Sequence, residues 1–202
     1  WASAEALRLA GVTATTPNPT DGEIGRDLNT GALTGLMVEA ASGIVERALA
    51  NSGHYTPEMD RAAVARSISV LNSFGVTGFL DSASMQPILA ALKGLDDREE
   101  LTAWSVCAMP IVEPGFMFGT AGDGLFAMRE DYRSAHVKPD FAKVFLDGVP
   151  GAKTAAFHEP YVADPVRGCC FRGTTMLTVP DLIRWLGKCE KPDPARVARP
   201  DR

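Results

Sequence analysis

Apolar and polar positions along this chain follow two spacings, one typical of helices and one typical of strands. The clearest helical spacing spans residues 57–74. Thr56 precedes it, and a threonine hydroxyl at this place can accept a backbone N–H of the first turn. The apolar run that follows, residues 75–81, is short and predicts a buried strand that ends on Asp81.

Helical and strand patterns alternate through the rest of the chain. Strands that are separated by helices usually pair in parallel, because the helix supplies the crossover between them. A parallel sheet that is buried on both faces would also explain why the predicted strands are almost entirely apolar. We therefore expect an α/β fold, with further helices over 85–93, 125–135 and 179–190 and further strands over 101–110 and 141–147.

The first fifty residues have a different pattern. Residues 1–11 predict one helix and residues 38–50 predict another. Between them, proline and glycine break the helical periodicity, and the Asn-Thr-Gly sequence at 29–31 can close a hairpin between residues 23–27 and 32–37. We expect this β-hairpin region to be inserted before the parallel sheet.

Composition narrows the class of protein. The chain has 202 residues and a net charge of -5, which fits one domain or a large piece of one. Its lysines and arginines form no basic stripe, so nucleic-acid binding is not expected. Its longest apolar runs are too short to cross a bilayer, so no membrane partner is expected. The four cysteines lack the spacing of a zinc ribbon and favour reduced thiols in a cytoplasmic protein.

One charged residue interrupts an apolar strand pattern. Lys143 lies in the predicted strand 141–147, on the same face as Phe141 and Asp147 if side chains alternate. In a closed parallel barrel this face would point inward, and the active sites of such barrels lie at the C-terminal ends of the strands. Asp147 would then stand at the mouth, with Lys143 about one strand-turn below it.

A buried lysine amine can serve several roles. Burial favours its neutral form, and a neutral amine can form a Schiff base, act as a general base, or take up carbon dioxide to give a carbamate that binds metal ions. Alternatively, Lys143 reaches solvent or pairs with Asp147. The spacing of the residues leaves these alternatives open, and a lysine Schiff-base aldolase is among them.

Five sequence blocks carry a resemblance to a known family. In chain order they are WASAEALRLAGVT, TPNPTDGEIGRD, GALTGLMVEAA, LNSFGVTGFLDSA and FAKVFLDGVPGAKTAAFHEPY. Over residues 1–190, the chain resembles the amidohydrolase family 3 (YtcJ-like) metal-dependent hydrolases, which include N-substituted formamide deformylases. The resemblance implies a (β/α)8 TIM barrel of the amidohydrolase superfamily. It also implies hydrolysis of C–N bonds of amide or formamide type, other than peptide bonds, by a metal-activated water.

The resemblance assigns a metal-binding role to one residue of this chain. It implies that Lys143 is carboxylated and bridges divalent metal ions, with zinc as the expected metal. The family's other ligands, which are histidines and an aspartate, have no counterpart in the sequence. We therefore expect residues 1–190 to be a partial barrel, inactive alone, with about strands two to four and an inserted region at 12–50. Residues 191–202 are expected to be a disordered or aberrant tail of an internal fragment.

Asp81 and His158 are further candidates, for contact with a small amide-type substrate. Asp81 ends a strand at the predicted barrel mouth, and the alternative is that it caps the next turn. His158 follows the lysine strand in a loop, and the alternative is an ordinary surface histidine. The competing function is a non-catalytic α/β fragment that binds a partner or self-associates into a homo-oligomer through open sheet edges.

Overall fold

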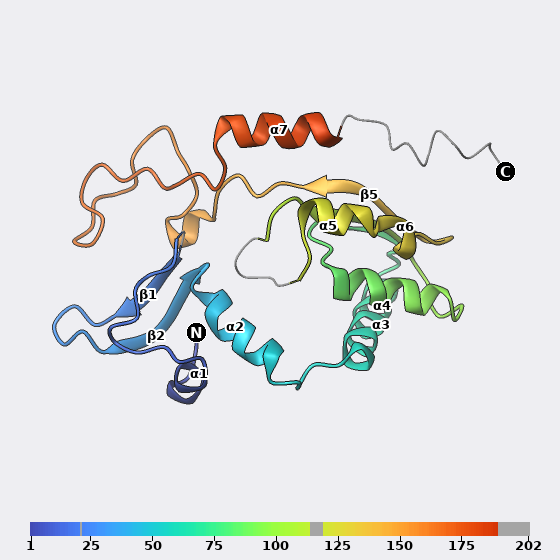
Figure 1. Ribbon diagram of the computed structural model, residues 1–202, viewed down its shortest axis with the longest axis horizontal. Coiled ribbons are helices and arrows are strands. Elements are labelled where there is room, and N and C mark those ends of the chain that lie inside the picture. Colours follow the sequence, from blue (N-terminus) through green and yellow to red (C-terminus); the bar gives the residue numbers. More distant parts are fainter. Residues whose placement is uncertain (21, 114–118, 190–202) are drawn as a thin grey trace. The chain divides into compact units, whose positions relative to one another are not determined.

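The computed structural model describes residues 1–20, 22–113 and 119–189 (Figure 1). By its internal contacts the chain divides into two units, Trp1–Val144 and Phe145–Arg202. The tail at 191–202, for which we expect disorder or an aberrant sequence, lies outside the described residues.

A short helix and a β-hairpin form the start of the first unit. Helix α1 is Ala4–Leu9, and strands β1 (Gly22–Arg26) and β2 (Leu33–Glu39) pair antiparallel, which confirms the predicted hairpin. The carboxylate of Asp27 accepts hydrogen bonds from the backbone N–H and the hydroxyl of Thr30 and so holds the turn. The hairpin and α1 share a small buried cluster, formed by Leu7, Val12, Ile24, Met37 and Ala41.

Helix α2 (Ser42–Asn51) begins later than the predicted range 38–50. The prediction was wrong at this boundary because β2 continues through Glu39, which pairs with Gly22 of β1. The φ angle of Glu39 is then 47°, a left-handed conformation that turns the chain out of the strand. Val38, the apolar residue at the start of the predicted helix, therefore belongs to the hairpin.

Helices and parallel strands alternate in the rest of the first unit. Thr56 caps α3 through its hydroxyl, which accepts the N–H of Met59 at 3.3 Å, as the sequence predicts. The strands pair in parallel in the order β3-β4-β5, which confirms the α/β class. The elements are α3 (Pro57–Ser73), β3 (Gly78–Asp81), α4 (Gln86–Asp96), β4 (Trp104–Pro110), α5 (Gly122–Ala127), α6 (Arg129–Tyr132) and β5 (Val137–Lys143).

Helices pack against one face of this parallel sheet. The packing follows from the strand period, because every second residue of β4 points to the same side. Cys107 and Met109 of β4 are therefore both buried against helical residues. The cluster consists of Ile68, Leu89, Leu92, Leu95, Leu101, Ala103, Cys107, Met109, Leu125 and Val137.

The opposite face of the sheet is partly open to solvent, although Ala108 and Pro110 of β4 are buried on that face. Leu80 of β3, Trp104 of β4 and Phe141 of β5 are 59%, 54% and 57% exposed. The register places all three on the side away from Cys107, since Gly78 pairs with Trp104 and Ala108 pairs with Phe141. The prediction of strands buried on both faces is therefore wrong for the outer strands β3 and β5, whereas the second half of β4 is buried on both faces.

Strand β5 lies four residues before the predicted strand 141–147, at Val137–Lys143. The register shifts between Val106 and Ala108, where β5 contains one extra residue next to Pro139. Proline lacks a backbone N–H and fits at such an irregularity. The strand consequently ends at Lys143, and the lysine does not lie in its middle.

Among the described residues the three parallel strands do not close into a barrel. Their assignment to barrel strands two to four stays a prediction, as does the boundary at residue 190. The second unit contains a short 3-10 helix, Pro150–Ala152, and the helix α7, Val179–Cys189. The latter agrees with the helix expected at 179–190.

Candidate functional site

Lys143 lies at the carboxyl end of β5. It pairs with Pro110, the last residue of β4, and its carbonyl oxygen accepts the N–H of Ile111 at 3.0 Å. The lysine is partly exposed. This position differs from the expected one, because Lys143 itself stands at the strand end, where the sequence predicts Asp147.

The face on which Lys143 lies follows from the strand register. Met109 of β4 packs into the helix-covered core and pairs with Ala142 of β5. Because successive side chains of a strand alternate, the next residue, Lys143, lies on the other face together with Phe141. The amine is thus on the face that the helices leave open, at the end of the sheet where the strands finish.

Asp81 lies on the opposite side of the sheet from Lys143. It pairs with Cys107, which faces the helices. Its carboxylate accepts a hydrogen bond from the hydroxyl of Ser84 at 2.6 Å and another from the N–H of Ala83 at 3.4 Å. The structure therefore does not bring Asp81 and Lys143 together, and the contacts of Asp81 are those of a turn cap.

A buried polar cluster adjoins Asp81, and it was not predicted from the sequence. Ser84 and Ser105 are both fully buried. The N–H of Ser84 donates to the carbonyl of Ala108 at 2.9 Å, and the hydroxyl of Ser105 lies 3.3 Å from the sulfur of Cys107. Burial raises the pKa of the Cys107 thiol, which therefore stays protonated near neutral pH. The cluster ties the turn after β3 to β4, and the signal for it was the two-residue spacing of Ser105 and Cys107.

Asp147 and His158 belong to the second unit, where each has local contacts. The carboxylate of Asp147 accepts the N–H of Ala156 at 2.9 Å. His158 has an exposed side chain, and its carbonyl oxygen accepts a hydrogen bond from the guanidinium of Arg172. The predicted roles of Asp147 beside Lys143 and of His158 toward a substrate stay predictions.

The donor atoms of the described residues do not make a complete metal site. Residues 1–20, 22–113 and 119–189 contain no cluster of three or more His, Cys, Asp and Glu side chains that could hold a metal ion. Lys143 is the one residue of this region for which a metal-binding role is expected. The described residues therefore supply one expected metal ligand and not a complete set of ligands.

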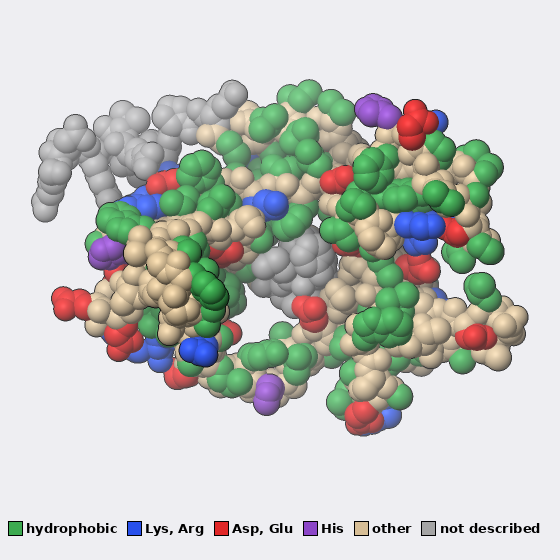
Figure 2. All heavy atoms as spheres, turned by 180° about the vertical axis from the view of Figure 1, so that it is seen from behind, with side chains coloured by type: hydrophobic (Ala, Val, Ile, Leu, Met, Phe, Trp, Pro, Cys, Tyr) green, Lys and Arg blue, Asp and Glu red, His purple; other side chains and the backbone are tan. Residues whose placement is uncertain are grey.

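Surface charge is mixed on the face that Figure 2 displays, where lysine and arginine side chains are interspersed with aspartate and glutamate. Such a surface offers no single basic stripe on that face. Within the described ranges, no helix has the length and apolar character needed to span a membrane.

Comparisons with known proteins give a family and a fold. A family model described as "Amidohydrolase family" matches residues 1–193. A curated relative, the exoenzymes regulatory protein AepA of Pectobacterium carotovorum subsp. carotovorum, is 26% identical over 171 residues. That match covers 80% of this chain and 34% of the relative.

Two solved structures share the fold. The first is an uncharacterized metal-dependent hydrolase from Pyrococcus horikoshii OT3, at a TM-score of 0.62 and 20% identity, and the match covers 93% of this chain and 34% of that one. The second is an uncharacterized metal-dependent hydrolase from Pyrococcus furiosus, at a TM-score of 0.59 and 18% identity, with 93% and 35% covered. The chain thus spans about a third of the length of these proteins.

Proposed function

The chain belongs to the amidohydrolase family, and on this premise we propose that it forms part of a metal-dependent hydrolase. The proposed reaction is cleavage of C–N bonds of amide or formamide type, other than peptide bonds, in a small-molecule substrate. Both structural relatives are described as metal-dependent hydrolases, which supports the reaction class.

The position of Lys143 carries the proposal. Its side chain lies at the carboxyl end of a parallel strand and on the face away from the helices. In barrels built from parallel strands, active sites lie at this end. We propose that the amine of Lys143 takes up carbon dioxide, loses a proton and becomes a carbamate, whose anionic oxygens are suitable ligands for divalent cations.

The proposed cofactor is a divalent metal, with zinc as our choice because it accepts nitrogen and oxygen ligands. A metal of this kind lowers the pKa of bound water and polarises a scissile carbonyl. Since the described residues supply one expected ligand, we assign no catalytic step to this chain alone. We propose that the other ligands come from segments outside residues 1–202.

We also propose that the protein is cytoplasmic. All four cysteines are free in the structure, and free thiols are the usual state in a reducing compartment. Asp81 and His158 remain our candidates for substrate contact, with Asp147 as a further candidate for catalysis. The contacts described above for these three residues are all with nearby parts of the chain.

A substrate panel tests this proposal. The complete protein that contains this chain would be purified, freed of metal with a chelator and reloaded with zinc or another divalent metal. N-substituted formamides and simple amides would then be assayed, with ester analogues of the same size as controls. We expect hydrolysis of an amide or formamide that disappears without metal and returns on reloading. Hydrolysis of esters alone, or amide hydrolysis that is indifferent to chelation, would contradict the proposal.

A non-catalytic role is the second candidate for the 202-residue chain by itself. Two observations favour it: the described residues lack a metal-ligand cluster, and Leu80, Trp104 and Phe141 expose apolar surface on one face of the sheet. Exposed apolar surface and open strand edges promote association. Sedimentation velocity of the purified chain, together with assays of its metal content and amide hydrolysis, would separate the two cases. A homo-oligomer without bound metal supports association. A monomer that hydrolyses amides excludes a purely associative role.

A further inference from the structure

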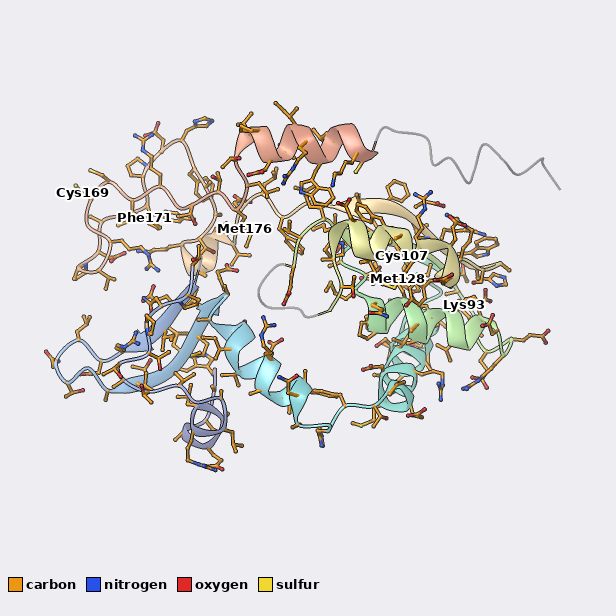
Figure 3. All side chains as sticks on the ribbon, in the orientation of Figure 1. Lys93, Cys107, Met128, Cys169, Phe171 and Met176 are labelled. Atoms are coloured by element: carbon orange, nitrogen blue, oxygen red, sulfur yellow. The ribbon has the colours of Figure 1, made fainter. Side chains whose placement is uncertain are left out.

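Two adjacent cysteines lie in a loop of the second unit. The sulfur atoms of Cys169 and Cys170 are 2.9 Å apart, and both residues are exposed. Figure 3 shows Cys169 at the outer edge of this loop, whereas Phe171 lies inside it. An exposed pair of thiols in contact has a chemistry that a single cysteine lacks, because one sulfur can displace a group bound to the other.

The backbone is held on both sides of the cysteine pair. Before the pair, the N–H of Gly168 donates to the carbonyl of Asp164 at 2.9 Å. After the pair, the carbonyl of Phe171 accepts the N–H of Tyr161 at 2.8 Å, and the two aromatic rings stack at 6.0 Å between centroids. These contacts restrict the loop on either side, so that the two sulfurs remain neighbours.

A charged turn reinforces this arrangement. One carboxylate oxygen of Asp164 accepts the N–H groups of Val166 and Arg167, each at 2.8 Å. The other oxygen accepts a hydrogen bond from the Lys153 ammonium at 2.7 Å. The turn that leads into the cysteines is therefore pinned to an earlier part of the same unit.

The pKa of the Cys170 thiol bears on the order in which the two sulfurs would react. The hydrogen bond to Cys169 raises the pKa of the Cys170 thiol. A raised pKa means that the thiol of Cys170 holds its proton more firmly, while its sulfur lies 2.9 Å from that of Cys169. We therefore assign the role of the resolving thiol to Cys170, which leaves Cys169 as the attacking sulfur of the pair.

We propose that Cys169 and Cys170 form a redox-active dithiol that a low-molecular-weight disulfide converts reversibly to an intramolecular disulfide. In the first step, the Cys169 thiolate attacks one sulfur of the oxidant, forms a mixed disulfide and releases one thiolate. In the second step, Cys170 loses its proton and attacks the Cys169 sulfur, which expels the second thiolate. The protein loses two electrons and two protons, and the oxidant is reduced to two thiols.

The geometry of neighbouring residues makes this disulfide easy to reduce. Adjacent Cα atoms across a trans peptide are about 3.8 Å apart, whereas disulfides usually join Cα atoms roughly 4.4–6.8 Å apart. Bonds outside the usual geometry are more reducible and belong to the labile class. The pair is thus suited to report the thiol–disulfide state of its surroundings, whatever the function of the parent protein.

Oxidation of the purified, reduced 202-residue chain by glutathione disulfide tests the proposal. After acid quenching and alkylation of remaining thiols, mass spectrometry of peptides would locate each modification. We expect the peptide with Cys169 and Cys170 to lose two hydrogen atoms and to escape alkylation, and dithiothreitol to restore it. In Cys170→Ser, we expect a stable glutathione adduct on Cys169, since the resolving thiol is gone.

Cys189→Ser is the matched control, because Cys189 is also exposed but lies in α7. This variant should still form the disulfide between the adjacent cysteines. The proposal fails if wild-type Cys169 accumulates the glutathione adduct as much as the Cys170→Ser variant does. It fails equally if the pair stays reduced while Cys189 reacts, or if oxidation of the pair requires Cys189. Urea unfolding midpoints of the two serine variants should match the wild type, because all three thiols are on the surface.

Discussion

Lys143 and Pro110 lie side by side at the carboxyl ends of two parallel strands, and the Lys143 carbonyl continues the pairing by accepting the N–H of Ile111. In a parallel ladder a carbonyl accepts the N–H of the residue that follows its partner, so this hydrogen bond continues the ordinary pattern. The hydrogen bonds between the strands thus fix the backbone of Lys143 at the carboxyl end of the sheet, where both strands finish. The consequence for function is that the amine is anchored at the end of the sheet where parallel barrels place their chemistry.

Asp96 is the first residue whose contribution to stability can be measured. Its side chain is 7% exposed, and it accepts hydrogen bonds from the ring nitrogen of His136 at 2.7 Å and from the His136 N–H at 3.0 Å. Burial alone would raise the pKa of this carboxyl, but the hydrogen bonds from Ser134 and His136 outweigh it and hold the pKa below its usual 3.8. The ionised form is therefore favoured in the folded chain.

Replacement of Asp96 by asparagine should lower the free energy of unfolding at pH 7 by about 2 kcal/mol, because hydrogen bonds to a charged group are lost. The stabilisation by Asp96 is present above pH 3.8 and is lost as the pH falls through the lower pKa of the folded state. Urea unfolding at several pH values measures both effects. Asp97→Asn is the control, since its side chain is 56% exposed and should cost about 0.5 kcal/mol or less. Equal losses for the two variants would contradict this account.

Asp164 offers a test of the second unit that is independent of any ligand. The hydrogen bond from Lys153, followed by those from the Arg167 and Val166 N–H groups, lowers the pKa of Asp164 to about 2. Carbon NMR of the carboxyl should give that midpoint, and Lys153→Met should move the midpoint upward. The stabilisation of the turn should accordingly persist until the pH falls toward this value. Asp27, whose pKa is lowered by hydrogen bonds with Thr30 and Asn29, must titrate unchanged in the Lys153 variant.

Leu89 of α4 tests where the core of the parallel unit lies. It is fully buried in the helix-covered cluster, so Leu89→Ala should cost about 2–5 kcal/mol of unfolding free energy. Leu80 has the same side chain but is 59% exposed, and Leu80→Ala should cost no more than about 0.5 kcal/mol. Urea denaturation of both variants distinguishes the two faces of the sheet. A large loss at Leu80 would show that this face is covered in solution.

The sequence indicated the order of elements better than their ends. The cap of α3 at Thr56 was predictable because its chemistry is local. The limits of β5 were not, because its polar residues and Pro139 do not resemble a buried strand, and an edge strand with an irregular register tolerates both. Partner strands decide such boundaries, and a single sequence does not display them.

The candidate site could be predicted only in part for the same reason. That Lys143 shares a face with Phe141 follows from alternation, which the sequence contains. The placement of Asp81 on the other face depends on its register with Cys107, and the contact with buried Ser84 depends on a turn. These are pairings between distant or irregular segments, so they became visible only in the fold.

The metal content of the complete protein tests the central claim most directly. It would be measured by mass spectrometry of the elements for the wild type, for Lys143→Ala and for Lys138→Ala, after incubation with zinc and bicarbonate. Lys138 is the matched control because it lies on the same strand, and its ammonium instead binds the Ser134 carbonyl at 2.8 Å. Our account predicts that Lys143→Ala loses bound metal while Lys138→Ala retains it. Wild-type metal content in a folded Lys143→Ala protein would contradict the account.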